Sequence, residues 1–200
     1  MGSEMCIRDR HPELYVRQEI EHLEVFVGFE TQNRYSVRTP SGEQLLYAFE
    51  ESSMLGRNFL SSHRPLTIHV VDRNNTEVIN ASRSFFWFHS HLHVSDGTGQ
   101  RIGSMQRRFS FLTRKFDLMD ATGNVVAEMR GPIFRPFTFM VYRQGQEIGR
   151  VTKQWSGLGR EAFTDADTFK VEVDTSRTDQ DFSLLMLASA ISIDLDFFEK

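Results

Sequence analysis

The sequence predicts a mainly β protein with about ten to twelve short strands in a mostly antiparallel sheet, and one C-terminal helix. Three observations support this prediction. Short runs rich in β-branched and aromatic residues alternate with turn residues, the two halves of the chain share a pattern, and an apolar run closes the sequence. Two similar halves of this kind indicate a closed or sandwiched sheet around one core.

The first ten residues fit neither the strand pattern nor that of a targeting peptide. Met5 to Arg10, MCIRDR, resembles one reading frame of the transposon-end adapter used in sequencing libraries. We therefore interpret residues 1–10 as a disordered, adapter-derived segment and expect a single domain over 11–200. No signal peptide is visible, which favours an intracellular location, either cytoplasmic or peripherally associated with a membrane.

Composition argues against several classes of protein. Lys and Arg number 23 and Asp and Glu 27, a net charge of -4, whereas a nucleic-acid-binding domain is normally basic. We therefore expect no nucleic-acid partner. Cys6 is the only cysteine and lies in the adapter-like segment, so the rest of the sequence predicts no disulfide, cysteine nucleophile, thiolate zinc site or thioester-linked acyl anchor.

From Phe29 onward, turn residues separate strand-like runs, which is the pattern of consecutive β-hairpins. Apolar and polar residues alternate in LTIHVVD and FTFMVYR, as in strands with one buried face. The predicted turns are Pro40-Ser41-Gly42, Asn74-Asn75, Asp96-Gly97, Thr122-Gly123-Asn124 and Gly145-Gln146.

An internal repeat relates the two halves of the chain. Arg34-Tyr35-Ser36 matches Lys115-Phe116-Asp117, and RPLTI from Arg64 to Ile68 matches RPFTF from Arg135 to Phe139. The repeat predicts two equivalent halves of one closed or sandwiched sheet, and not two independent domains.

The C-terminal run predicts a buried helix. Phe182 to Ile193 carries no charge and is apolar on nearly every side, so a helix there must be enclosed by protein or by lipid. A bilayer span needs about 20 apolar residues, whereas Asp194 and Asp196 interrupt this run. Enclosure in protein is therefore favoured, and a helix threaded through a β-barrel satisfies both observations.

The stretch from Lys153 to Phe169, KQWSGLGREAFTDADTF, offers two local functional hypotheses. In the first, Gly157, Gly159 and Ala162 match the dinucleotide pattern G-x-G-x-x-G/A. That pattern binds a dinucleotide only where it links a strand to a helix in a βαβ unit. Hairpins flank it here, so a glycine turn between strands is favoured over a nucleotide site.

In the second hypothesis, Asp165 and Asp167 are metal ligands. They do not begin an EF-hand, because Lys170 stands where that loop needs glycine and Ser176 where it needs glutamate. Two interpretations stay open: a weak, irregular Ca²⁺ site, or an acidic turn that leads into a strand. In the second interpretation, the inner face of that strand consists of Phe169, Val171 and Val173.

Two further clusters, one of histidines and one of aromatic residues, are candidate sites. His89, His91 and His93 alternate and so share one face of a strand, but the outer two lie ~13 Å apart and cannot bind one ion together. A solvent-facing strand is favoured. Phe85 to Phe88, FFWF, fits either the headgroup level of a membrane or a core filled from both faces of a strand, and we favour the core.

A basic run is the candidate site for lipid headgroups. No acidic residue interrupts the sequence from Arg101 to Lys115, and each such charge contributes about 1 kcal/mol near an anionic lipid surface. The solvated side of a hairpin explains the run equally well. The candidate residues are Arg101, Arg107, Arg108, Arg114 and Lys115.

No motif for covalent catalysis stands in the sequence. A G-x-S-x-G elbow, an H-E-x-x-H pair and a Walker loop are all absent. We therefore expect a protein that is not an enzyme, with Ca²⁺ as the one cofactor to consider.

The Lys153 to Phe169 stretch resembles the signature of the phospholipid scramblase family, within the wider tubby-like and LURP-one-related superfamily. The resemblance covers residues 14–199. Its motifs are KQWSG from Lys153, REAFTDAD from Arg160, Phe169, GFET from Gly28 with Asn33, Arg34 and Tyr35, RPL from Arg64, Gly131-Pro132, and the C-terminal IDLDFFE.

This resemblance implies a twelve-stranded antiparallel β-barrel wrapped around a buried C-terminal helix. It also implies calcium-stimulated, ATP-independent, bidirectional movement of phospholipids between membrane leaflets, with the phospholipid membrane surface as the partner. The family's cation segment maps onto Asp165, Asp167, Phe169, Val171, Val173 and Ser176.

Two departures from the family pattern favour an alternative hypothesis. The acidic last position of the cation segment is Ser176, and the family's palmitoylated, cysteine-rich stretch corresponds to SFFWFHSHLHV, which has no cysteine. Acyl chains are a means of stable membrane anchoring. The alternative is a soluble intracellular tubby-like module that binds lipid or protein and transports no lipid.

Overall fold

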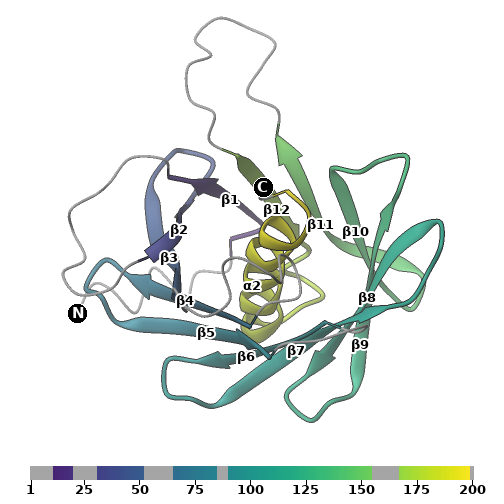
Figure 1. The fold of residues 1–200 in the computed structure, drawn as a ribbon, viewed down its shortest axis with the longest axis horizontal. Helices are drawn as coiled ribbons and strands as arrows, with labels where there is room; N and C mark the ends of the chain where they lie inside the picture. The colour runs from purple at the N-terminus through teal and green to yellow at the C-terminus, as the bar shows by residue number, and fades with distance from the viewer. Residues whose placement is uncertain (1–10, 20–30, 52–64, 85–89, 155–166, 199–200) are drawn as a thin grey trace, which may run out of the picture.

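The computed structural model describes residues 11–19, 31–51, 65–84, 90–154 and 167–198, which form twelve strands and one helix, α2 (Figure 1). Each strand pairs antiparallel with its neighbours in the sequence, and β1 pairs with β12, so the barrel is closed. The predicted barrel fold is confirmed. The strands are β1 (Glu13–Gln18), β2 (Thr31–Arg38), β3 (Gln44–Glu51), β4 (Leu66–Asp72), β5 (Glu77–Arg83), β6 (His91–Asp96), β7 (Arg101–Arg108), β8 (Thr113–Asp120), β9 (Val125–Pro132), β10 (Thr138–Arg143), β11 (Gln146–Gln154) and β12 (Thr168–Val173).

The five predicted turns all join consecutive strands of the barrel. The turn between β8 and β9 shows why its residues suit a tight reversal. Oδ1 of Asp120 accepts hydrogen bonds from the backbone N–H groups of Thr122 and Asn124, each at 2.9 Å. Gly123 has φ 90°, a conformation that glycine adopts without steric cost.

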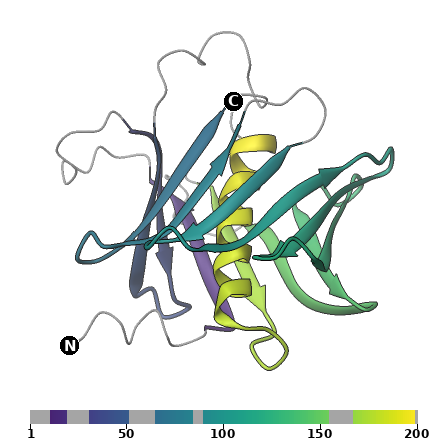
Figure 2. The ribbon, with the colours of Figure 1, turned by 90° about the horizontal axis from the view of Figure 1, so that it is seen from below.

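Helix α2 (Gln180–Phe197) runs through the middle of the ring of strands (Figures 1 and 2). It starts at Asp179, whose side chain accepts a hydrogen bond from the Phe182 N–H at 2.8 Å. Every residue from Leu185 to Leu195 is buried, which confirms the predicted enclosed helix. The described chain contains no helix that is long and apolar enough to cross a bilayer.

Gly103 lets β7 lie close to both β8 and α2. A Cβ atom on Gly103 of β7 would lie 2.4 Å from the backbone oxygen of Met119 and 3.2 Å from Leu185 of the helix. Tyr35 and Phe116, which the internal repeat pairs, are both 1% exposed. The two halves of the chain therefore supply equivalent aromatic residues to one core.

Because neighbouring strands are antiparallel, their connections alternate between the two ends of the barrel. The connections after β7 and β9 lie at the end where α2 finishes, which we call the helix-C end. The hairpin turns after β6, β8 and β10 lie at the end where α2 starts, which we call the helix-N end. The two ends differ in the side chains they expose.

Candidate functional site

The structure divides the basic run between the two ends of the barrel. Arg101 begins β7 at the helix-N end and Arg108 ends it at the helix-C end, about 23 Å apart at the usual rise of a strand. The guanidinium of Arg101 donates a hydrogen bond to Oγ of Ser104 at 3.3 Å. Arg101 therefore lies away from the other four cations of the predicted headgroup site.

Arg107 and Arg114 point into the helix-C end of the barrel. They lie opposite Phe116 and Gly131 in the strand register, and directly opposed residues share a face of the sheet. Their guanidinium carbons lie 5.2 Å and 4.5 Å from the ring centroid of Phe197, the last residue of α2. Cations are favourable at this position, because the C-terminus of a helix carries partial negative charge.

Arg114 is held in place by its surroundings. Its Nη1 donates a hydrogen bond to the carbonyl of Pro136 at 3.2 Å. Burial, and then the charge of Arg107, lowers the pKa of the Arg114 guanidinium. Two like charges are therefore kept close together, an arrangement that binding of an anion would relieve.

Arg108 and Lys115 lie opposite each other on the outer face of the barrel. Arg108 pairs with Asp117 at 3.0 Å and Lys115 with Glu128 at 3.8 Å, while their side chains stay 62% and 41% exposed. Exposed ion pairs of this kind contribute about 0–1 kcal/mol to stability. Both cations are therefore accessible to a phosphate group.

Sequence reasoning missed a group of apolar side chains beside these cations. They occupy the β7–β8 and β9–β10 connections, where polar turn residues are the rule. The run FSFL, between two strands and without Gly, Pro, Asn or Asp, was the signal that could have revealed them. The exposed side chains are Phe109 (76%), Phe111 (83%), Leu112 (78%), Ile133 (51%) and Phe134 (81%).

Of the two predicted metal ligands, Asp167 is described and Asp165 lies outside the described residues. Oδ2 of Asp167 is 2.5 Å from Nζ of Lys153, which also lies 4.3 Å from the ring centroid of Phe198. The cation at the carboxylate of Asp167 is therefore a lysine ammonium. Trp155, Arg160 and Phe163 of the signature also lie outside the described residues.

Five of the six positions of the implied cation segment are described, and they extend along the whole of β12. Phe169, Val171 and Val173 are buried in the core, as the interpretation of an apolar inner face predicts. The whole of β12 separates Asp167 from Ser176, whose hydroxyl donates to Asp174 at the other end of the barrel. An oxygen-ligated ion needs its ligands within about 2.6 Å, so Asp167 and Ser176 cannot share one.

The described histidines of the alternating cluster, His91 and His93, share the outer face of β6 with ring centroids 4.1 Å apart. Burial lowers the pKa of both rings, with a further lowering from the charge of Arg101. His89 and Phe85 to Phe88 lie outside the described residues. Within the described ranges, no group of three His, Cys, Asp or Glu side chains is placed to hold a metal ion.

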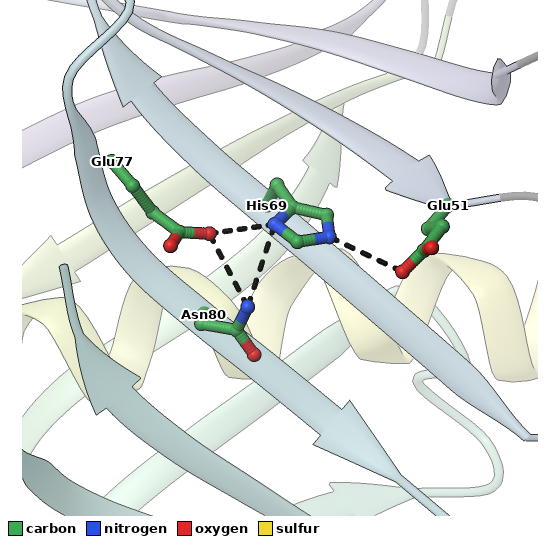
Figure 3. A network of polar contacts seen from close by, with 4 residues as sticks. All are labelled: Glu51, His69, Glu77 and Asn80. Atoms are coloured by element: carbon green, nitrogen blue, oxygen red, sulfur yellow. Dashed lines mark hydrogen bonds and ion pairs between the residues drawn. The ribbon is translucent and has the colours of Figure 1, made fainter. Parts of the chain in front are cut away.

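A second polar network lies on the outer face across β3, β4 and β5 (Figure 3). Nδ1 of His69 is 2.6 Å from Oε1 of Glu77, and its Nε2 is 3.4 Å from Oε2 of Glu51. Asn80 donates to Glu77 at 3.2 Å, and the His69 ring stacks on Phe49. The network joins three strands, which is a structural role.

A cavity of about 200 Å³ opens at the helix-N end, beside the first turn of α2. Arg143 and the acidic residues Asp120, Asp179 and Asp181 are among the residues that line it. Burial, and then the charges of Asp179 and Asp96, raises the pKa of Asp181. The helix-N end is therefore a region of negative potential, in contrast to the cations at the helix-C end.

Comparison with known proteins places this geometry in context. The model of one protein family, Scramblase, matches residues 5–200. Phospholipid scramblase 1 of Mus musculus is 29% identical over 202 aligned positions, 94% of this chain and 61% of the relative. The human protein of the same name is 27% identical, and the match covers 94% of this chain and 63% of that relative. Altered inheritance rate of mitochondria protein 25 of Saccharomyces cerevisiae is 26% identical, and the match covers 94% of this chain and 71% of that relative.

The chain thus spans less than two thirds of the length of the two phospholipid scramblases 1 that it matches. No solved structure matches it.

Proposed function

Because this chain belongs to the scramblase family, we propose that it moves phospholipids between the leaflets of a membrane, in both directions and without ATP. The observation that carries the proposal is the family match, which extends over residues 5–200. Several relatives, including those of mouse and human, are named phospholipid scramblases.

The placement of the cations supports a phospholipid as the ligand. Four of the five predicted headgroup residues gather at the helix-C end, where Arg107 and Arg114 face inward and Arg108 and Lys115 face outward. Guanidinium and ammonium groups bind phosphate through charge-assisted hydrogen bonds. We expect this end of the barrel to bind the lipid phosphate.

The interior of the barrel constrains the route of a lipid. α2 and the inward side chains of the strands fill it, with Met186, Ala190 and Ile193 among the side chains that are fully buried. A headgroup that passes from leaflet to leaflet would therefore follow the outside of the barrel and not a central lumen.

Calcium stimulation stays a prediction, assigned to Asp165 and Asp167. The described part of the cation segment forms no site for one ion, and Lys153 already neutralises Asp167. Any effect of calcium on transport is therefore expected to depend on competition with this lysine.

Lipid transport by the purified chain tests the proposal. Vesicles carrying a fluorescent phospholipid in both leaflets would be reconstituted with protein, and the outer label bleached by a reductant that cannot cross the bilayer. The proposal expects bleaching beyond the outer-leaflet fraction without ATP, in calcium or in chelator. Bleaching that stops at the outer-leaflet fraction in both conditions would exclude it.

The rival function is a lipid-binding or protein-interaction module of the same fold without transport. The enclosure of α2 favours it, because the most apolar segment of the chain is committed to the barrel core. The same vesicles distinguish the two functions. A binding module sediments with the vesicles but leaves the label of the inner leaflet protected from the reductant.

A further inference from the structure

Five large apolar side chains project from the helix-C end, which we call the apolar tips: Phe109, Phe111, Leu112, Ile133 and Phe134. The rings of Phe109 and Phe111 meet edge to face with centroids 4.9 Å apart. The N–H of Ile133 donates to the carbonyl of Leu112 at 3.4 Å, which links the two connections. The tips therefore form one cluster held by the rigid strands below it.

Exposure of this kind calls for an explanation. Single apolar side chains on a surface are ordinary, whereas a contiguous group rimmed by polar residues marks a surface that meets another molecule or a membrane. Phe111, Leu112 and Phe134 are each about four-fifths exposed. Four other phenylalanines pack against Phe197 and Phe198 at the end of α2 instead: Phe116, Phe137, Phe139 and Phe169.

The surroundings of the apolar tips are basic. The sequence contains no acidic residue from 101 to 115 or from 129 to 146. Residues 107–115 contribute four positive charges and 130–136 two, six in all. We call these cations the basic rim: Arg107, Arg108, Arg114, Lys115, Arg130 and Arg135.

Cations at the helix-N end have acidic neighbours. Arg73 pairs with Glu43 at 2.8 Å and Arg177 with Asp174 at 3.4 Å. The aspartates of the hairpin turns and of the first turn of α2 add further negative charge there. In the basic rim, Arg108 pairs with Asp117, and both Lys115 and Arg130 pair with Glu128. Six rim cations against these two acids leave an excess of positive charge around the apolar tips.

From this arrangement we propose that the helix-C end docks on an anionic phospholipid bilayer, with the apolar tips inserted at the headgroup level and the basic rim bound to lipid phosphates. The inference rests on the proposed function. It adds the surface by which the protein meets the membrane and the orientation of the barrel there. Membrane affinity of this kind combines buried apolar area with electrostatic attraction to anionic lipids.

Charge complementarity favours a bilayer over a second copy of the chain. Two copies meeting by their tips would bring twelve rim cations together, which like-charge repulsion opposes. Insertion is expected to be shallow, because unpaired backbone groups in a hairpin connection need water or headgroups as partners.

The test uses flotation of the full chain with vesicles of phosphatidylcholine alone or mixed with phosphatidylserine. The tip variant is Phe111→Ser/Leu112→Ser/Phe134→Ser, and the matched control is Val125→Ser, which removes a 57% exposed side chain at the helix-N end. Thermal unfolding verifies that both variants fold. In a Cys6→Ser background, an environment-sensitive fluorophore is placed at Ser110→Cys or, for comparison, at Ala121→Cys.

We expect the tip variant to bind mixed vesicles about tenfold more weakly or worse and Val125→Ser to bind like the parent chain. The fluorophore should shift to shorter wavelength at position 110 only. Equal binding of parent and tip variant, or a shift at 121 alone, would overturn the inference and leave the proposed function standing. Failure of the parent chain to bind any vesicle would overturn both the inference and the proposed function. A tip variant that changes only the self-association of the chain would assign the surface to a second copy and overturn the inference.

Discussion

The hydroxyl of Tyr35 in β2 donates a hydrogen bond to Oδ2 of Asp194 in α2 across 2.8 Å, and both residues are buried. Two residues further on, Asp196 forms an ion pair with Arg83 of β5, with both side chains less than 5% exposed. The barrel therefore supplies partners for the two acids that interrupt the apolar run. Their burial depends on those partners, since an uncompensated charge is costly in a core.

We predict that Tyr35→Phe destabilises the fold by about 1–3 kcal/mol, the usual cost of removing one partner of a buried hydrogen bond. Urea unfolding measures the change. Tyr142→Phe is the matched control, because its hydroxyl donates only to Sδ of Met140 at 3.4 Å, and it should change the free energy of unfolding by less than about 0.5 kcal/mol. Equal losses in the two variants would contradict the role of the Tyr35 bond.

Gly103→Ala should destabilise the barrel by about 1–3 kcal/mol through overpacking. The added methyl group would lie 2.4 Å from the backbone oxygen of Met119, which cannot move without shifting β8. Calorimetric Tm measures the loss. A variant with the Tm of the parent chain would show that β7 and β8 do not approach each other at Gly103 as closely as described.

Stability should fall at mildly acidic pH because of His91 and His93. Their folded-state pKa values are lowered, mainly by burial, below the value of about 6.5 expected in the unfolded chain. The unfolded state then binds more protons as pH falls through that value, so the free energy of unfolding decreases. His91→Asn/His93→Asn should flatten the dependence between about pH 7.5 and pH 5.5, and an unchanged slope would contradict this account.

If Asp165 and Asp167 carry calcium stimulation, Lys153→Gln should lower the calcium concentration that gives half-maximal transport. The reason is that the Lys153 ammonium competes for the carboxylate of Asp167. Lys170→Gln is the matched control, since that lysine pairs with Glu13 and Glu172. If both variants lower the half-maximal calcium concentration equally, the effect comes from the change in net charge and not from the Lys153–Asp167 pair.

Much of the fold was predictable because local and long-range signals agree. Alternation in LTIHVVD and FTFMVYR predicted β4 and β10, and the repeat predicted two equivalent halves of one sheet. The structure adds that the matched residues Tyr35 and Phe116 are both buried in the core. The partners of Asp194 and Asp196 were not predictable, because no local pattern shows that strands 159 and 113 residues away reach them.

The candidate site was predictable only in part. The basic run identified the cations, but not that β7 carries Arg101 to one end of the barrel and Arg108 to the other. The inward orientation of Arg107 and Arg114 depends on the register with β8 and β9, which the sequence does not state. The segment after Asp167 was ambiguous locally, and β12 resolves it as a strand with a buried apolar face.

The initial rate of phospholipid transport in two charge-matched variants tests most directly the claim that the helix-C end acts on lipid. Arg108→Gln/Arg135→Gln removes two cations of the basic rim, and Arg101→Gln/Arg177→Gln removes two from the helix-N end. At about 1 kcal/mol for each cation near an anionic surface, the first variant should lower the rate about tenfold or more at limiting protein, while the second stays within about twofold of the parent chain. Equal rates in the two variants, or no transport by the parent chain, would contradict the claim.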